Sequence, residues 1–138
     1  MRILAVDWGV RRIGLAVSDP GGIIATGLPT LVVRGRAAAI KGVALAAVEH
    51  QAERIVVGLP LLMSGVRGEA AQAAQAFAEA LARRTGLSVA TYDERLTTAM
   101  ARRRLHESGV RTGSARTRVD QGAAVALLES YLQRVAER

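Results

Sequence analysis

The stretch that decides the fold lies at the start of the chain, where residues 2–19 read Arg2-Ile3-Leu4-Ala5-Val6-Asp7-Trp8-Gly9-Val10-Arg11-Arg12-Ile13-Gly14-Leu15-Ala16-Val17-Ser18-Asp19. Two apolar runs flank a short polar turn that contains glycine, a pattern typical of a β-hairpin. Side chains alternate along a strand, so Ile3, Ala5 and Asp7 share one face and Leu4 and Val6 share the other. Because both faces are apolar until Asp7, this hairpin is expected at the centre of a sheet.

Asp7 is a carboxylate at the end of a strand that is otherwise apolar. Burying an ionised carboxylate without a partner is costly, so Asp7 needs a cation, several hydrogen-bond donors or a metal. Gly9 permits a tight turn and the approach of a phosphate or metal to the backbone. Trp8, between them, either packs in the core or stacks on a base or sugar. The alternative interpretation of Asp7 is that it only caps the turn, since Asp-x-Gly is common in turns.

The size and composition of the chain limit the classes of protein to which it can belong. The 138 residues fit one domain, spanning 1–138, with a sizeable buried core. Its apolar runs are too short to span a bilayer and no signal-peptide pattern opens the chain, so a cytoplasmic location without membrane contact is expected. The chain has no cysteine, which leaves oxygen or imidazole ligands for any metal.

The charge of the chain points to an acidic partner. The formal net charge is +7 and Lys41 is the only lysine, so the positive charge is nearly all arginine. Arginine suits bidentate contact with phosphate, which favours a nucleic acid as partner, although a basic surface can also serve solubility alone. Aromatic residues are scarce, which argues against a surface that stacks single-stranded bases.

The rest of the chain predicts alternating strands and helices. After the turn at Asp19-Pro20-Gly21-Gly22, turn signals and apolar periodicity predict a third, antiparallel strand over 23–33, a helix over 37–51, a strand over 54–58, a helix over 69–85, a strand over 87–92, a helix over about 97–107 and a last helix over about 118–136. The first helix is predicted from apolar positions that recur at helical spacing: Ile40, Val43, Ala44, Ala47 and Val48. The order β-β-β-α-β-α-β-α-α predicts an α/β fold with a mixed five-stranded sheet and helices on both faces.

Three acidic positions stand where a purely structural residue is not expected. In the last helix, Ala124, Leu127, Leu128 and Tyr131 form an apolar stripe with Asp120 at its beginning, in the predicted first turn. Asp7, Asp120 and one of Asp93 and Glu94 can converge in such a sheet, and the other of these two neighbours would orient Arg95. Buried carboxylates that lie close together take up protons unless a cation holds them ionised, so the cluster predicts a divalent metal. Oxygen ligands favour Mg²⁺ or Mn²⁺.

Four ordered motifs also carry a resemblance to a known family. They are Asp7-Trp8-Gly9 with 12–19, Val57-Gly58-Leu59-Pro60, Asp93-Glu94-Arg95-Leu96-Thr97-Thr98, and Val119-Asp120 with Ala123-Ala124 and Tyr131-Leu132. Together they resemble the YqgF/RuvX family, which implies a ribonuclease H-like fold of the RuvC resolvase superfamily and metal-dependent nuclease activity. The resemblance implies that Asp7, Glu94 and Asp120 are the catalytic acids and metal ligands, and it selects Glu94 over Asp93 by analogy only. The chain departs from the family pattern at Leu62, where a polar residue is usual, and at 116–118, where arginine replaces lysine.

The leading functional hypothesis is an endonuclease that cuts structured nucleic acid, similar to a Holliday junction resolvase. The arginines expected to contact phosphate are Arg11, Arg12, Arg67, Arg95, Arg116 and Arg118. Cutting a four-way junction symmetrically needs two active sites, so a homodimer is expected in that case. The alternatives are maturation of the 5′ end of pre-16S rRNA, a small ATP-handling domain, and a catalytically weak scaffold in ribosome assembly or transcription.

Overall fold

The computed structural model describes residues 1–9, 11–60, 68–96 and 115–136, with the backbone alone described for residues 96 and 115–121. Its elements are β1 (Ile3–Asp7), β2 (Arg12–Ser18), β3 (Ala25–Val32), α1 (Arg36–Glu49), β4 (Arg54–Leu59), α2 (Glu69–Thr85), β5 (Ser88–Asp93), the 3-10 turn η1 (Glu94–Leu96) and α4 (Ala115–Ala136). The helix predicted over 97–107 lies outside the described residues.

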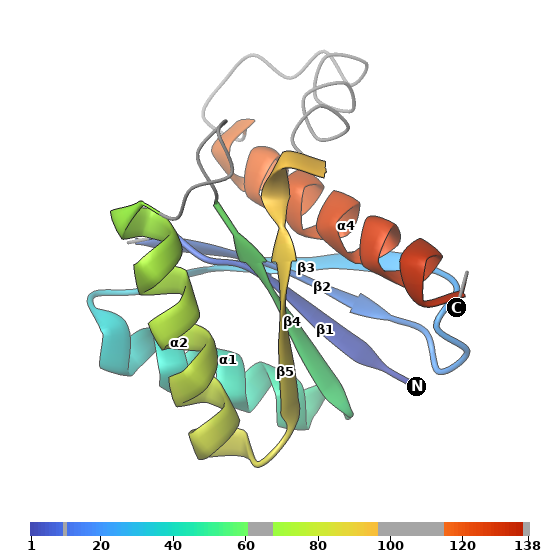
Figure 1. Cartoon of the computed structure of the whole chain (residues 1–138), viewed down its shortest axis with the longest axis horizontal. Helices are drawn as coiled ribbons and strands as arrows, with labels where there is room; N and C mark the ends of the chain where they lie inside the picture. Colours follow the sequence, from blue (N-terminus) through green and yellow to red (C-terminus); the bar gives the residue numbers. More distant parts are fainter. Residues whose placement is uncertain (10, 61–67, 97–114, 137–138) are drawn as a thin grey trace.

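The five strands form one mixed sheet in the order β3-β2-β1-β4-β5 (Figure 1). The first three strands are joined antiparallel, whereas β1 pairs parallel with β4 and β4 pairs parallel with β5. The hairpin of residues 2–19 therefore supplies the central strand, as its apolar pattern predicts. The predicted α/β sheet is confirmed.

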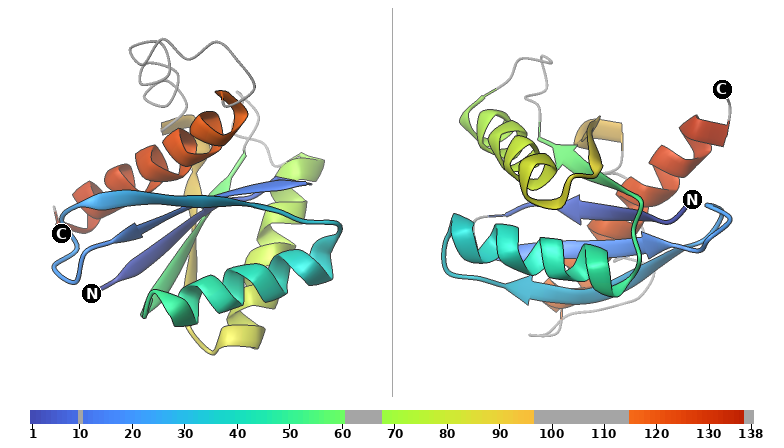
Figure 2. Two further views of the ribbon diagram at one scale, coloured as in Figure 1. Left: turned by 180° about the vertical axis from the view of Figure 1, so that it is seen from behind. Right: turned by 90° about the horizontal axis from the view of Figure 1, so that it is seen from below.

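Helices cover both faces of this sheet, with α1 and α2 on one side and α4 on the other (Figure 2). The alternation along β1 separates the two cores as predicted: Leu4 and Val6 pack with residues of α1 and α2, and Ile3 and Ala5 pack with residues of α4. All four side chains are at most 3% exposed. Asp7 continues the Ile3 and Ala5 row, so it lies on the α4 side of the sheet.

Two predicted boundaries are wrong for local reasons. The third strand begins at Ala25 rather than 23, because the backbone N–H groups of Ile23 and Ile24 donate to the Asp19 carboxylate at 2.7 and 2.8 Å and so belong to the turn. The last helix begins at Ala115, since alanine and arginine before residue 118 are good helix formers. Asp120 therefore lies in the second turn, not the first, and loses the stabilisation by the helix dipole that a first-turn position would give.

The predicted first helix is confirmed as α1, and its buried face follows only part of the apolar pattern. Val43 and Ala47 are buried, the buried stripe is completed by Ala39 and Ala46, and Val48 is 77% exposed. Apolar residues surround α1 on nearly all sides, so the sequence periodicity does not select one face.

Candidate active site

Three neighbouring strands bring the candidate acidic residues to one end of the sheet. Asp7 ends β1, Gly58 is the second-last residue of β4, and Glu94 directly follows β5. The carboxyl ends of β4 and β5, η1 and the beginning of α4 meet at this end (Figure 1). The register pairs Ala5 with Val56, so Asp7 and Gly58 lie level two residues further on, on the same face of the sheet.

Gly58 has no side chain, which leaves room for the Glu94 side chain to lie across β4. Because β4 separates β1 from β5, the outer two strands are about 10 Å apart, and Glu94 reaches Asp7 only by lying over β4. A Cβ atom at position 58 would stand 2.8 Å from the Glu94 Cγ and 3.0 Å from its Cδ, closer than real Cβ contacts. Glycine is thus required here by the close approach of another side chain.

Sequence reasoning missed this role of Gly58. A glycine inside a strand signals the close approach of another group, but which group requires the register of three strands.

Asp7 and Glu94 form a carboxyl pair. Burial of Glu94, its hydrogen bond with Asp7, and the charges of Asp7 and then Asp93 together raise the pKa of Glu94 to about 9. Glu94 is therefore protonated at neutral pH in the metal-free protein and donates to the Asp7 carboxylate. Two close carboxyl groups keep such a proton until a cation takes its place.

Asp93 makes a different set of contacts. Its carboxylate accepts hydrogen bonds from the Arg95 backbone N–H and Nε, both at 3.0 Å, and from Nη2 at 2.7 Å. The side-chain bonds from Arg95, followed by the backbone bond and the positive charge nearby, hold the pKa of Asp93 below its ordinary value against the effect of partial burial. The strand-end bend into η1 thus separates the two neighbouring acids, with Glu94 directed to Asp7 and Asp93 bound to Arg95.

The backbone of α4 brings position 120 to the same side of the sheet. Ala124, one turn after Asp120, is fully buried, and α4 contacts both β1 and η1. The side chain of Asp120 lies outside the described residues. Among the side chains that the structure describes, no three carboxylate or imidazole groups gather within reach of one metal ion, so Asp7 and Glu94 are the described part of the predicted cluster.

Aromatic packing on the α1–α2 side of the sheet anchors the end of β1. Trp8 follows Asp7 directly, and its ring stacks on Phe77 of α2 with centroids 5.5 Å apart and planes inclined by 28°. Phe77 is fully buried. Trp8 therefore packs in the core, one of the two roles the sequence allows, and anchors the end of β1 that carries Asp7.

The predicted phosphate-binding arginines fall into three groups. Arg11 is exposed in the turn after Asp7, and Arg12 is half-buried at the start of β2, so both lie at the Asp7 end of the sheet. Arg95 is bound to Asp93. Arg116 and Arg118 lie in the first turn of α4, of which only the backbone is described, and Arg67 lies outside the described residues.

Comparison with known proteins identifies the family. The family model RuvX, described as Holliday junction resolvase, matches residues 1–134. The chain belongs to the RuvX family. A relative from Koribacter versatilis (strain Ellin345) is 41% identical over 133 residues, covering 96% of this chain and 87% of the relative. One from Mycobacterium tuberculosis (strain ATCC 25618 / H37Rv) is 43% identical over 132 residues, covering 95% and 78%. Both relatives carry the name "Putative pre-16S rRNA nuclease".

Solved structures show the fold of this RuvX family member independently. Thermus thermophilus RuvC in complex with a Holliday junction substrate matches with a TM-score of 0.62 at 16% identity, covering 98% of this chain and 96% of that chain. The Fowlpox virus resolvase in complex with Holliday junction DNA also matches with a TM-score of 0.62, at 11% identity, covering 98% and 99%. The predicted ribonuclease H-like fold is thus confirmed.

Proposed function

We propose that this chain is a divalent-metal-dependent endonuclease that hydrolyses phosphodiester bonds in structured nucleic acid. The observation that carries the proposal is the Asp7–Glu94 carboxyl pair, built across Gly58 at one end of the sheet beside an arginine-bearing turn. Membership of the RuvX family and the names of the relatives support nuclease activity. The net charge of +7 supports binding to a polyanion.

The carboxyl pair fits a hard divalent cation. Its donors are all oxygen, and Glu94 holds a proton that a cation can displace. We expect Asp7 and Glu94 to hold Mg²⁺ or Mn²⁺, with Asp120 as a third ligand. When bound, the metal supplies an activated water and stabilises charge on the phosphate oxygens.

The protein's own residues then position the reaction. Asp7 is fixed by the strand and by the stacking of Trp8 on Phe77. Glu94 would hold the metal through its carboxylate oxygens beside those of Asp7, in the place where it now shares a proton with Asp7. Arg11 and Arg12 contact phosphates beside the cleaved bond, and Asp93 keeps Arg95 at the rim of the site.

The substrate that the relatives support best is the precursor of 16S rRNA, cut during maturation of its 5′ end. Relatives at 41% and 43% identity are named as nucleases of pre-16S rRNA, and they align with nearly the whole chain.

A second candidate substrate is a four-way DNA junction. It is favoured by the description of the RuvX family and by the shared fold with two resolvases solved with Holliday junctions. Two symmetric cuts would then require a homodimer.

Among the described helices, none has the length and apolar character needed to cross a membrane.

The test is cleavage of three labelled substrates by the purified protein with Mg²⁺ or Mn²⁺: a 5′-extended 16S precursor RNA, a four-way DNA junction and a linear duplex. Asp7→Asn is compared with Asp19→Asn, a matched control in the turn before β3. Cutting of the precursor RNA that Asp7→Asn abolishes and Asp19→Asn preserves supports the proposal.

Asp7-dependent cutting of the junction alone would select the second candidate. Cutting that survives Asp7→Asn would contradict the proposed site. A folded, metal-supplied protein that binds RNA without cutting any substrate would favour the scaffold hypothesis instead.

A further inference from the structure

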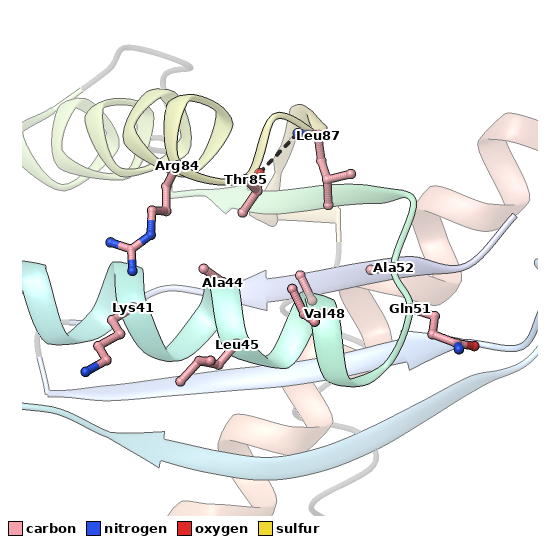
Figure 3. Close-up of a pocket in the computed structure, with 10 residues that line it drawn as sticks. Lys41, Ala44, Leu45, Val48, Gln51, Ala52, Arg84, Thr85 and Leu87 are labelled. Atoms are coloured by element: carbon pink, nitrogen blue, oxygen red, sulfur yellow. Dashed lines mark hydrogen bonds between the residues drawn. The ribbon is translucent and has the colours of Figure 1, made fainter.

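The outward side of α1 exposes large apolar residues far from the candidate active site. Leu45 is 60% exposed and Val48 is 77% exposed, although Ala46 and Ala47 between them are buried. A cavity of about 420 Å³ opens beside them, between α1 and the end of α2 (Figure 3). Contiguous exposed apolar surface of this kind is typical of an interaction site.

We call this cavity the α1–α2 groove and define it by Lys41, Leu45, Val48, Gln51, Arg84 and Leu87. Leu45, Val48 and Leu87 form its apolar middle. Lys41 and Arg84 lie toward one end in Figure 3, and Gln51 lies at the other. Among the described residues that line the groove, the charged ones are these two cations, so it combines an apolar floor with a positive end.

The groove and the candidate active site lie at opposite ends of β5. Leu87 precedes the first residue of β5 and Glu94 follows the last one. The six residues of this strand span about 20 Å. A molecule bound in the groove therefore leaves the Asp7–Glu94 pair open to nucleic acid.

We propose that the α1–α2 groove docks an amphipathic helix of a protein partner. The apolar face of the partner helix contacts Leu45, Val48 and Leu87. Acidic residues of the partner helix lie at the end that faces Lys41 and Arg84. The helical rise from Lys41 to Val48 is about 10 Å, so about two turns of a docked helix span the distance from the cations to the apolar middle. Helix-in-groove recognition uses apolar anchors on one face of the docked helix, three or four residues apart. The inference concerns binding alone and does not depend on which nucleic acid is cut.

A partner with acidic residues fits the groove better than a second copy of this chain. A second copy offers Lys41 and Arg84 no acidic partner among the residues that line the groove, and it carries a net charge of +7 of its own. Like charges brought together at an interface oppose association, whereas acidic groups at this end favour it.

The probe is a fluorescein-labelled helical peptide of about four turns, with leucines on one face and glutamates at one end. Its counterpart carries lysines in place of the glutamates. Binding to the full chain is followed by fluorescence anisotropy. The affinity of the acidic peptide is expected to be at least about tenfold higher than that of the lysine peptide.

Three variants locate the binding. Val48→Glu is expected to weaken binding of the acidic peptide by about tenfold or more, because it places a charge in the apolar middle of the groove. Ile23→Glu is the matched control, since Ile23 is 78% exposed in the turn before β3, and it should leave affinity unchanged. The double variant Lys41→Glu with Arg84→Glu should reverse the order of the two peptides.

Equal affinity for the two peptides would overturn the proposal, as would equal weakening by Val48→Glu and Ile23→Glu. Analytical ultracentrifugation of the peptide-free protein supplies a further test. A concentration-dependent dimer that Val48→Glu abolishes would assign the groove to a second copy and overturn the partner helix. Cleavage assays are not used, so these outcomes are independent of whether the nuclease proposal holds.

Discussion

Replacing Glu94 with glutamine is expected to stabilise the metal-free protein at neutral pH. In the folded protein the pKa of Glu94 is about 9, against an ordinary value of 4.5. Folding therefore favours the protonated side chain. Below pH 4.5 the acid is protonated in both states and costs nothing, and the cost of keeping it protonated grows as the pH rises, up to the folded pKa of about 9. Glutamine is neutral at every pH and avoids this cost.

The size of the effect follows from the pKa difference. At pH 7 the solution lies 2.5 pH units above the ordinary pKa of 4.5. Each unit corresponds to about 1.4 kcal/mol, which gives a ceiling of about 3.5 kcal/mol. Because the Glu94 side chain is only half-buried, we expect a gain of about 1 to 3 kcal/mol in the free energy of unfolding.

The assay is urea unfolding in the presence of a chelator at several pH values between 5 and 8.5, comparing wild type, Glu94→Gln and the exposed control Glu79→Gln on α2. The stability gap between Glu94→Gln and wild type should widen as the pH rises and close toward pH 5, while the control follows wild type. A destabilised Glu94→Gln protein, or a gap that does not change with pH, would refute the buried carboxyl pair.

Three further substitutions should change either the cleavage rate or the affinity for nucleic acid. Gly58→Ala should lower the cleavage rate by about a hundredfold, because its Cβ displaces Glu94, whereas Gly122→Ala on α4, with nothing within 4 Å of the added Cβ, should not; single-turnover kinetics compares the two. Asp7→Asn should abolish cleavage and leave nucleic-acid affinity equal or higher, since a repulsive charge near phosphate is lost, and weaker binding with retained cleavage in a filter-binding and cleavage comparison would contradict this. Arg12→Gln should flatten the dependence of log affinity on log salt by about one unit, and an unchanged slope would remove this arginine from the phosphate contacts.

Local patterns predict the central part of this fold. The two apolar runs around Gly9 predict the hairpin, and strict alternation along residues 3–7 assigns Leu4 to one core and Ala5 to the other, as the structure confirms. The turn role of Asp19 was also predictable, because an aspartate before Pro-Gly-Gly has backbone N–H groups within reach.

Other features depend on tertiary contacts that a pattern does not contain. The exposed position of Val48 was not predictable, because a helix that is apolar on nearly every side packs by the shape of its neighbours rather than by periodicity. Strand alternation left Asp93 and Glu94 equivalent until the bend into η1 separated them. The role of Gly58 requires the register of β1, β4 and β5 together, since the side chain it accommodates comes from one outer strand and contacts the other.

Asp7 and Glu94 are proposed to act together as a metal-binding catalytic pair. The most direct test measures Mn²⁺ binding and cleavage of the precursor RNA and the four-way junction by wild type and Glu94→Gln at pH 7, on protein shown to be folded. We expect Glu94→Gln to be the more stable protein, yet to bind Mn²⁺ weakly and to cut neither substrate. A Glu94→Gln protein that binds Mn²⁺ and cuts at the wild-type rate would contradict it.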